Sequence, residues 1–416
     1  MNITAVRGFN DILPDRSELW RHIEDEARRI FSCYGFSEIR VPVVERTELF
    51  SRSIGETTDI VEKEMYTFTD RRGDSLTLRP EGTAPVVRAY IEHKLYNEMP
   101  VARLYYTGPM YRYERPQKRR YRQFYQIGAE VLGETSPGVD AEVIEGLVTL
   151  FKKLGVVGAT LHINSLGCPE CRPRYKEKLE VFLETVKEKL CGNCLRRIEA
   201  NPLRALDCKN PGCIEATGEA PAILEAVCGE CGEHFTALRG HLGELGIEYT
   251  VNPRMVRGLD YYTKTTFEIT AEGLGSQNAV AAGGRYDGLV KELGGPDTPC
   301  FGFAIGMERL VLLLEERSVS AGPLTVLIAM GEEAGKKGTP FVRVLRERGK
   351  RVVVDYGDGS LKNRMKRAHR TGARFVVIVG EDELADGVVT VKDMESGGQD
   401  RLPPEKAVDR IAAEGV

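Results

Sequence analysis

Apolar residues recur every three or four positions near the start of the chain, over residues 16–34. At that spacing one helical face carries Leu19, Ile23, Ala27, Ile30 and Phe31. The pattern predicts an amphipathic helix that packs this face against a core.

Further apolar runs, some of them alternating, continue to about residue 155. They predict strands over residues 36–42, 75–80, 101–108 and 123–133, and helices over residues 83–96 and 139–154. The first strand should stop at Pro42, because proline lacks the N–H that continues a ladder. Strands and helices do not alternate strictly, so the order favours an α+β class with helices packed on an antiparallel sheet.

The residue pattern changes over about residues 165–245. This segment is rich in cysteine, and it is predicted to be helical with turns at Gly167, Gly192 and Gly212. The strand pattern then resumes over residues 265–270, 279–282 and 300–305, followed by a helix over residues 307–314. The middle segment is therefore expected to be an insertion in a single sheet domain.

A linker-like stretch, Ser-Val-Ser-Ala-Gly-Pro, ends at residue 323 and separates the last part of the chain. Beyond it, strands are predicted over residues 324–330, 351–355, 374–380 and 388–392, with helices over residues 331–348 and 360–371. Strict alternation of this kind predicts a small α/β domain with a mostly parallel sheet over residues 323–416.

Composition is that of an ordinary globular protein, with 416 residues, 42% hydrophobic and 29% charged residues. The net charge of −4 argues against a uniformly basic nucleic-acid coat and against a disordered acidic chain. No apolar run approaches the ~18 residues of a membrane helix, and the first residues lack a signal-peptide pattern. A cytoplasmic protein without membrane contact is expected.

Several common catalytic motifs are missing from the sequence. There is no GxxxxGK[ST] phosphate loop, no GxGxxG between a strand and a helix, and no HExxH pair among the 6 histidines. By contrast, residues 103–122 hold seven Lys/Arg, one Glu and five interleaved tyrosines. Guanidinium groups bind phosphate and aromatic rings stack on bases, so this stretch suits a nucleotide or a nucleic-acid end. A solvated charged hairpin explains the composition equally well.

Neighbouring segments favour the nucleotide interpretation. Residues 36–45, 112–130 and 302–310 resemble motifs 1, 2 and 3 of class II aminoacyl-tRNA synthetases. Residues 255–262 (MVRGLDYY) and 281–288 (AAGGRYDG) resemble the two signatures specific to histidyl-tRNA synthetases, and residues 77–83 (TLRPEGT) also match. The resemblance covers the whole chain in order. Arg119, where the family usually has glycine, and Met255, where it has leucine, are the departures.

The resemblance implies a ligase that activates L-histidine with ATP and magnesium and then transfers it to histidine tRNA. It also implies a homodimer formed through motif 1. Residues 1–320 would be the catalytic domain and residues 323–416 an α/β anticodon-binding domain. The alternative is a synthetase-like regulatory subunit that senses histidine without catalysis. Such paralogues tend to lack the last domain and the signature residues, both of which are present here.

The resemblance also carries over roles for individual residues. Arg112, Arg257 and Arg309 would be catalytic and hold the phosphates. Glu114 and Arg120 would complete the ATP site. Histidine would be bound by Glu81, Gly82, Thr83, Gln126, Glu130, Tyr261 and Tyr262. Gly283 and Gly284 would let the backbone pass close to the substrate.

Two sets of basic residues are candidates for tRNA contact. The first set follows motif 2 and consists of Arg115, Lys118, Arg119 and Arg122. The second set has a spacing of four, which places Lys362, Lys366 and Arg370 on one helical stripe that would continue to Arg374. A solvated helix face is as good an explanation for that stripe.

Eight of the 10 cysteines fall within the predicted insertion, in four close pairs. The pairs are Cys168 and Cys171, Cys191 and Cys194, Cys208 and Cys213, and Cys228 and Cys231. Such pairs suit one or two structural zinc sites, and a reducing compartment argues against disulfides. Reduced, partly buried cysteines without a metal are the alternative, and a zinc-ribbon nucleic-acid module would explain the insertion alone.

Overall fold

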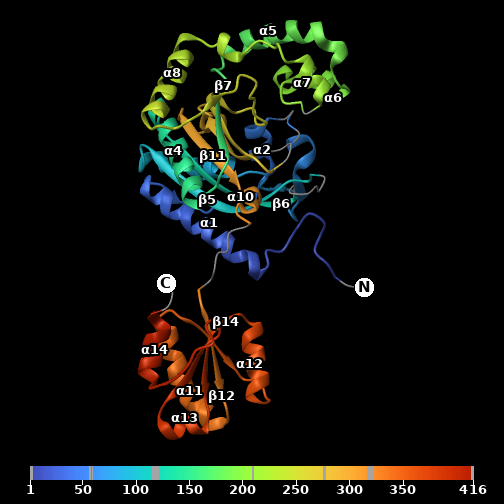
Figure 1. Ribbon diagram of the computed structural model, residues 1–416. Helices are drawn as coiled ribbons and strands as arrows, with labels where there is room; N and C mark the ends of the chain where they lie inside the picture. The colour runs from blue at the N-terminus through green and yellow to red at the C-terminus, as the bar shows by residue number, and fades with distance from the viewer. Residues whose placement is uncertain are drawn as a thin grey trace. The chain divides into compact units, whose positions relative to one another are not determined.

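The computed structural model describes residues 3–55, 58, 60–114, 121–208, 210–274, 278–315 and 322–413. The chain divides into two compact units, Met1–Ser318 and Val319–Val416, shown in Figure 1. No helix in these ranges has the length and apolar composition needed to cross a membrane.

An eight-stranded sheet in the order β1-β5-β6-β11-β10-β9-β7-β8 forms the base of the first unit. Its strands are β1 (Ser37–Glu38), β5 (Ala102–Tyr111), β6 (Gln123–Leu132), β7 (Ala159–Ser165), β8 (Thr250–Val251), β9 (Thr263–Ala271), β10 (Ala279–Arg285) and β11 (Cys300–Gly306). The six inner strands pair antiparallel, and only the short edge strands β1 and β8 pair parallel with their neighbours. The expected antiparallel sheet with flanking helices is confirmed.

Helices α1 (Pro14–Cys33) and α4 (Pro137–Leu154) lie beside each other and cover the sheet (Figure 1). Every apolar position predicted for the inner face of α1 is buried, together with Trp20. α4 begins where the Ser136 hydroxyl accepts the Gly138 N–H, and ends at Gly155 in a left-handed conformation (φ 67°). Both helix predictions are confirmed to within a few residues.

A smaller sheet in the order β2-β4-β3 stands beside these elements. Its strands are β2 (Val44–Arg46), β3 (Tyr66–Thr69) and β4 (Ser75–Leu78), and helix α2 (Thr47–Ile54) packs on it. The other short helical elements of the first unit outside residues 165–245 are a π-turn (Ile60–Glu64), α3 (Thr83–Glu92), a 3-10 turn (Leu95–Asn97), α9 (Leu289–Glu292) and α10 (Met307–Leu313). The strand predicted over residues 36–42 is wrong beyond Glu38. The guanidinium of Arg79 donates to the carbonyl of Val41 at 2.9 Å, so a side chain takes the hydrogen bond that a neighbouring strand would make.

Between β7 and β8 the chain forms a group of helices, drawn in green and yellow in Figure 1. They are α5 (Cys171–Val186), a 3-10 turn (Lys187–Lys189), α6 (Gly192–Ala200), a 3-10 turn (Pro202–Ala205), α7 (Pro211–Ala216), a 3-10 turn (Ile223–Glu225) and α8 (Gly229–Glu244). We call this group the insertion.

The second unit contains a five-stranded sheet in the order β13-β12-β14-β15-β16. Its elements are β12 (Leu324–Ala329), α11 (Glu332–Glu347), β13 (Arg351–Asp355), α12 (Leu361–Arg370), β14 (Ala373–Val379), α13 (Glu381–Asp386), β15 (Val389–Asp393), β16 (Gln399–Leu402) and α14 (Pro404–Ala413). The strands β13, β12 and β14 are parallel, whereas β15 and β16 pair antiparallel. The sheet is therefore mixed, and the polar strand β16 gave no apolar signal.

The basic stripe predicted along α12 is shorter than expected. Lys362, Lys366 and Arg370 are exposed on the helix, but Arg374 lies in strand β14 and pairs with Asp393 at 3.1 Å. Helix α12 ends at Arg370 and the chain turns at Gly372, in a left-handed conformation (φ 70°), so the four-residue spacing does not continue.

Candidate active site

A cavity of about 340 Å³ in the first unit is lined from several segments far apart in the sequence. They include the start of α3, strand β5 with the residues that follow it, strand β6, residues 257–262, strand β10 and the junction of β11 with α10. The cavity brings together nine of the residues predicted for histidine and ATP: Glu81, Thr83, Arg112, Glu114, Gln126, Arg257, Tyr261, Tyr262 and Arg309. Its volume falls in the range of small-molecule sites.

Glu81 is buried just before α3, and its carboxylate accepts two backbone N–H groups of the first turn of that helix. One oxygen takes the N–H of Thr83 at 2.7 Å and the other takes that of Ala84 at 2.9 Å. Helix N-terminal N–H groups are short of acceptors, so the carboxylate satisfies them and is fixed in place. Burial raises the pKa of Glu81, and the backbone donors oppose that rise.

Glu130 lies behind the cavity rather than in its lining. It is fully buried on β6, accepts the hydroxyl of Thr83 at 2.7 Å and that of Tyr286 at 2.5 Å, and has its pKa raised by burial to about 8. Thr83 does line the cavity. The geometry therefore favours an indirect role for Glu130, through the orientation of Thr83, and direct contact with an imidazole stays a prediction.

Gly82 also lies behind the lining, and its small size has a steric cause. A Cβ at this position would come within 2.2 Å of the ring of Tyr106, and a Cβ at Gly128 would meet the same ring at 2.2 Å. The buried Tyr106 ring thus fills the space that both glycines leave open. The packing fixes the backbone that carries Glu81 and Thr83.

Residues 257–262 place one guanidinium and two phenols at the cavity. Arg257 is paired with Glu268 at 3.2 Å, and its Cζ lies 5.4 Å from the ring centre of Tyr262. The rings of Tyr261 and Tyr262 lie 4.8 Å apart, and burial raises the pKa of both phenols. Both phenols therefore stay protonated at neutral pH and can donate hydrogen bonds.

Two further guanidinium groups reach the cavity, one from the residue after β5 and one from helix α10. Arg112, just after β5, donates to the carbonyl of Pro80 at 2.9 Å, and its Cζ lies 5.2 Å from the ring centre of Phe124. Arg309, in α10, donates to the carbonyl of Ala279. Each makes backbone contacts that orient its charge, so the cavity collects three arginines suited to phosphate oxygens.

Two polar groups of the lining complete the donor and acceptor set. The side-chain carbonyl of Gln126 is buried with no hydrogen-bond partner among the residues described, which leaves an acceptor for a ligand. Glu308 accepts the backbone N–H of Tyr125 at 2.9 Å, and burial raises its pKa to about 7. Glu114 and Glu308 are carboxylates that could serve as magnesium ligands.

The glycines of β10 make room for protein atoms rather than for a ligand, contrary to expectation. A Cβ at Gly283 would lie 2.2 Å from the carbonyl oxygen of Gly302, and a Cβ at Gly284 would lie 2.4 Å from that of Thr265. The residues of β10 that line the cavity are Ala279 to Ala282. These glycines therefore permit close packing of the strands under the cavity.

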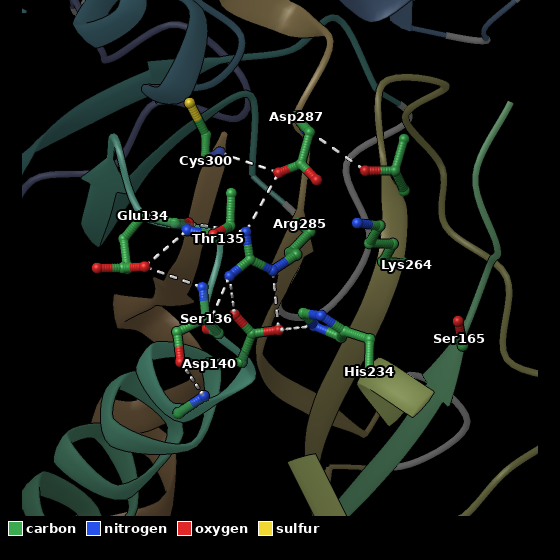
Figure 2. Close-up of polar contacts among 12 residues, drawn as sticks. Glu134, Thr135, Ser136, Asp140, Ser165, His234, Lys264, Arg285, Asp287 and Cys300 are labelled. Carbon is green, nitrogen blue, oxygen red and sulfur yellow. Dashed lines mark hydrogen bonds and ion pairs between the residues drawn. The ribbon is translucent and has the colours of Figure 1, made fainter. Parts of the chain in front are cut away.

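A buried network fixes the far end of β10, as Figure 2 shows. Arg285 is fully buried and makes an ion pair with Asp140 of α4 at 2.7 Å, and Asp140 is also 2.9 Å from the imidazole of His234 in α8. The remaining Arg285 contacts go to Asp287 and to the carbonyls of Glu134 and Ser136. Each N–H of the guanidinium has an oxygen within reach, as a buried arginine requires. The network ties the sheet to the insertion.

The basic candidates for tRNA contact are only partly described. Arg115, Lys118, Arg119 and Arg120 lie outside the described residues. Arg122 packs over the ring of Tyr113, with 4.0 Å from Cζ to the ring centre, and donates to the carbonyl of Glu114 at 3.1 Å. In the second unit, the exposed Lys362, Lys366 and Arg370 have no ion-pair partner within the described ranges.

The cysteines of the insertion converge in two separate groups. The first, the α5–α8 cluster, consists of Cys168, Cys171, Cys228 and Cys231; the second, the α6–α7 cluster, consists of Cys191, Cys194, Cys208 and Cys213. None of the eight lines the cavity. Each cluster offers four sulfur donors to a metal ion, and neither takes part in the cavity.

Sequence reasoning gave no role to several residues that build the site. Tyr286 and Arg285 stand in the segment AAGGRYDG, and Glu308 stands in the segment resembling motif 3, so the motifs contained them without revealing their contacts. Asp140 carried no local signal, because its importance depends on partners distant in the chain. Tyr106 stands out in the sequence only as one of the five tyrosines of residues 103–122, which does not reveal its packing against Gly82 and Gly128.

Comparison with known proteins adds independent information. The family model described as histidyl-tRNA synthetase matches residues 8–310, and the one described as anticodon binding domain matches residues 325–414. A histidine–tRNA ligase of Syntrophotalea carbinolica is 57% identical over 406 residues, covering 97% of each chain. A histidine–tRNA ligase of Geobacter sulfurreducens is 56% identical over 411 residues, covering 98% of this chain and 100% of its own.

A solved structure is similar over the same length. The apo histidyl-tRNA synthetase of S. aureus has 36% sequence identity and a TM-score of 0.82, covering 99% of this chain and 100% of its own. Family model, relatives and structure agree over both units, and the chain therefore belongs to the histidyl-tRNA synthetase family.

Proposed function

We propose that the chain is a histidine–tRNA ligase, which consumes ATP to form histidyl-adenylate and then transfers histidine to the 3′ end of histidine tRNA. The observation that carries the proposal is the single cavity that joins a fixed carboxylate, two phenols and three arginines. The full-length similarity to proteins named histidine–tRNA ligases supports the same activity.

The α-ammonium group of histidine would bind between Glu81, Thr83 and Gln126. The Thr83 hydroxyl donates its proton to Glu130, so its lone pairs remain to accept from the ammonium group. The Gln126 side-chain carbonyl supplies a second acceptor, and the Glu81 carboxylate supplies the negative charge that attracts the ammonium group. The imidazole would lie against Tyr261 and Tyr262, with Glu130 acting from behind.

The activation step is attack of a histidine carboxylate oxygen on the α-phosphorus of ATP. A carboxylate–phosphorus bond forms, the bond to the β-phosphate oxygen breaks, and pyrophosphate leaves. Negative charge spreads over the phosphate oxygens, so fixed cations and alignment matter more than proton transfer. Arg112 and Arg257 would hold the α-phosphate from two sides, Arg309 the γ-phosphate, and Glu114 the nucleotide, with Arg120 as a further contact.

Magnesium would enter with ATP and neutralise part of its charge. Glu114 and Glu308 are the carboxylates of the lining that fit such an ion, because oxygen ligands suit magnesium. The 2′- or 3′-hydroxyl of the terminal ribose would then attack the carbonyl of the adenylate and release AMP. The buried, protonated tyrosines keep histidine in position during this transfer.

The remaining expectations follow from the family. Residues 1–320 would be the catalytic domain, with the insertion at about 165–245, and residues 323–416 the anticodon-binding domain. Arg115, Lys118, Arg119 and Arg122 would meet the acceptor end, and Lys362, Lys366 and Arg370 the anticodon arm. A homodimer in the cytoplasm completes the proposal. The regulatory alternative is not favoured, because relatives above 50% identity carry the ligase name over their full length.

Histidine-dependent ATP–pyrophosphate exchange tests the proposal. Exchange should require histidine and should not occur with other amino acids, because the polar groups around the cavity would lack partners. Aminoacylation of histidine tRNA should follow with the same amino-acid requirement. Binding of histidine without any exchange would contradict the ligase and favour the regulatory alternative.

A further inference from the structure

The insertion gathers eight thiols into two sets of four, and this clustering calls for a ligand. Within each cluster all four Sγ atoms lie within 4.8 Å of one another. All of these cysteines are unbridged. Thiol groups attract each other weakly, so hydrophobic packing alone gives no reason for four sulfurs to converge twice.

In the α5–α8 cluster, two separate CxxC segments face each other. Sγ of Cys168 lies 3.5 Å from that of Cys171 and 3.9 Å from that of Cys228. The backbone N–H of Cys228 donates to Sγ of Cys171 at 3.0 Å. An amide that points at a sulfur of the opposite segment stabilises a thiolate there, as outer contacts do around metal ligands.

The α6–α7 cluster repeats this arrangement with different segments. Sγ of Cys191 lies 3.9 Å from that of Cys208, and the backbone N–H of Cys191 donates to Sγ of Cys213 at 3.1 Å. Two of its four cysteines, Cys194 and Cys213, lie in helices α6 and α7 and are buried. The two clusters share no residue, so each forms a closed set.

The spacing of the sulfurs identifies the kind of ligand. Zinc binds thiolates at about 2.3 Å in a tetrahedron, which requires sulfurs about 3.8 Å apart. The three Sγ–Sγ distances given above, 3.5, 3.9 and 3.9 Å, are close to this value, and all four sulfurs of each cluster lie within 4.8 Å of one another. A disulfide would need about 2.05 Å between two sulfurs and would leave the convergence of four unexplained.

We propose that each cluster binds one zinc ion through its four thiolates, so that one chain carries two structural zinc sites. Each site is closed, because four protein ligands leave no position for water or substrate. Binding replaces four thiol protons, which pass to the solvent. Cys33 and Cys300 lie outside both clusters and take no part.

The position of the sites suggests what they stabilise, and this step rests on the proposed function. Arg172, next to Cys171, donates to the carbonyl of Asp260 at 3.1 Å, and Arg204 of the insertion donates to the carbonyl of Gly258 at 3.0 Å. The segment that these arginines hold carries Arg257 and Tyr261. The zinc sites thus hold the insertion in the shape that positions this segment.

Metal analysis of the full chain, purified without chelator or added metal, tests the proposal directly. We expect two zinc ions per chain and, after denaturation with a chelator, 10 reactive thiols. Cobalt(II) in place of zinc should give the sulfur-to-cobalt charge-transfer bands of tetrahedral thiolate sites. Fewer than two zinc ions, iron instead of zinc, or only two reactive thiols, as four disulfides would leave, overturns the proposal.

Single substitutions assign the two ions separately. Cys228→Ser and Cys208→Ser, each at a half-buried ligand, should each reduce zinc to about one per chain. Cys33→Ser is the matched control at an exposed cysteine and should retain two. Two zinc ions in both ligand variants would overturn the assignment, and a variant that does not fold leaves the wild-type measurements decisive. Zinc-free protein that still performs exchange at the normal rate would overturn the role of the sites in positioning residues 257–261, without affecting the proposed ligase.

Discussion

The cavity and the insertion both gather residues from distant parts of the chain, but they do so in opposite ways. The cavity combines different side chains, each with its own partner: Glu81 on backbone amides, Thr83 on Glu130, and Arg257 on Glu268. The insertion repeats one side chain eight times. The chemistry of the cavity therefore depends on which side chains are present and how each is oriented. The chemistry of the insertion depends only on how close the sulfur atoms are to one another.

This difference affects how each region tolerates change. We expect that Arg257 can be replaced without unfolding the chain, because its charge is proposed to serve a ligand rather than the core. A cluster cysteine contributes to the fold itself, since binding of a structural metal is part of the folding free energy. The two regions nevertheless touch at residues 258–260, so a perturbation of one can reach the other.

Among the predictions, Arg257→Ala should have the largest effect on the cavity and none on the zinc content of the insertion. Removing the cation that we propose holds the α-phosphate should lower the exchange rate about 10²–10³-fold, by analogy with the loss of an oxyanion donor. The zinc content should stay at two per chain. Exchange kinetics and metal analysis on the same preparation measure both.

Arg174→Ala serves as the matched control, because this exposed arginine lies on helix α5 and does not line the cavity. Its exchange rate should equal that of the wild type. An Arg257→Ala enzyme with near-normal exchange would contradict the role given to this guanidinium.

A second test uses packing under the cavity. A Cβ at Gly302 would lie 1.7 Å from a carboxylate oxygen of Glu130, so Gly302→Ala must displace Glu130 and its hydrogen bond to Thr83. Overpacking of this kind costs about 1–3 kcal/mol of unfolding free energy. We also expect the KM for histidine to rise about tenfold, on the order of 1.4 kcal/mol. Thermal unfolding and exchange kinetics measure the two effects.

Gly240→Ala is the matched control within the insertion. A Cβ at this exposed position of α8 meets no atom within 4 Å, and alanine favours a helix over glycine by about 0.5–1 kcal/mol. The unfolding temperature should stay or rise. Normal stability and normal KM in Gly302→Ala would show that Glu130 does not depend on this space.

The spacing of apolar residues correctly predicted the elements whose packing depends only on their own side chains. The helix over residues 16–34 has an apolar face that is buried as expected, because its packing depends on one stripe of side chains. The strand over residues 36–42 failed beyond Glu38, because a side chain 38 positions away, Arg79, donates to the carbonyl of Val41. A pattern of apolar residues contains no information on a hydrogen bond from a distant side chain.

The family resemblance identified the cavity residues, but it did not show which of them line the cavity and which lie behind the lining. Glu81 and Glu130 read alike as substrate contacts, yet one lines the cavity and the other is buried behind Thr83. The pairing of Arg285 with Asp140 joins positions 145 residues apart and has no local signal. For the cysteines, sequence gave four pairs, and only the fold shows that the outer two pairs combine and the inner two combine.

A third, smaller effect concerns the pH dependence of stability. Burial raises the pKa of Glu130 in the folded chain to about 8, above its ordinary value of 4.5. The folded state therefore holds this proton more tightly, and the resulting stability is full below pH 4.5 and lost as the pH rises toward 8. Glu130→Gln should remove the loss, so its unfolding free energy relative to the wild type should increase between pH 5.5 and 7.5, by at most about 1.4 kcal/mol per pH unit.

Denaturant titrations at several pH values measure this difference. Glu177→Gln, a change at an exposed position of α5, is the control and should give a difference that does not vary with pH. A flat or falling difference for Glu130→Gln would contradict the buried, protonated state of this carboxyl.

The smallest expected effect tests the contact between the two regions. Arg172→Ala removes the hydrogen bond to the carbonyl of Asp260, and Asp260 lies directly before Tyr261 of the cavity. The lost contact acts on the site only through the backbone, so the KM for histidine should rise about 3–10-fold, or about 0.7–1.4 kcal/mol, with two zinc ions retained. Arg172→Lys should restore part of the affinity, and Arg174→Ala on the same helix should not change it. An unchanged KM in Arg172→Ala would mean that the insertion and the cavity work independently, since the residue would then hold the insertion without orienting the substrate.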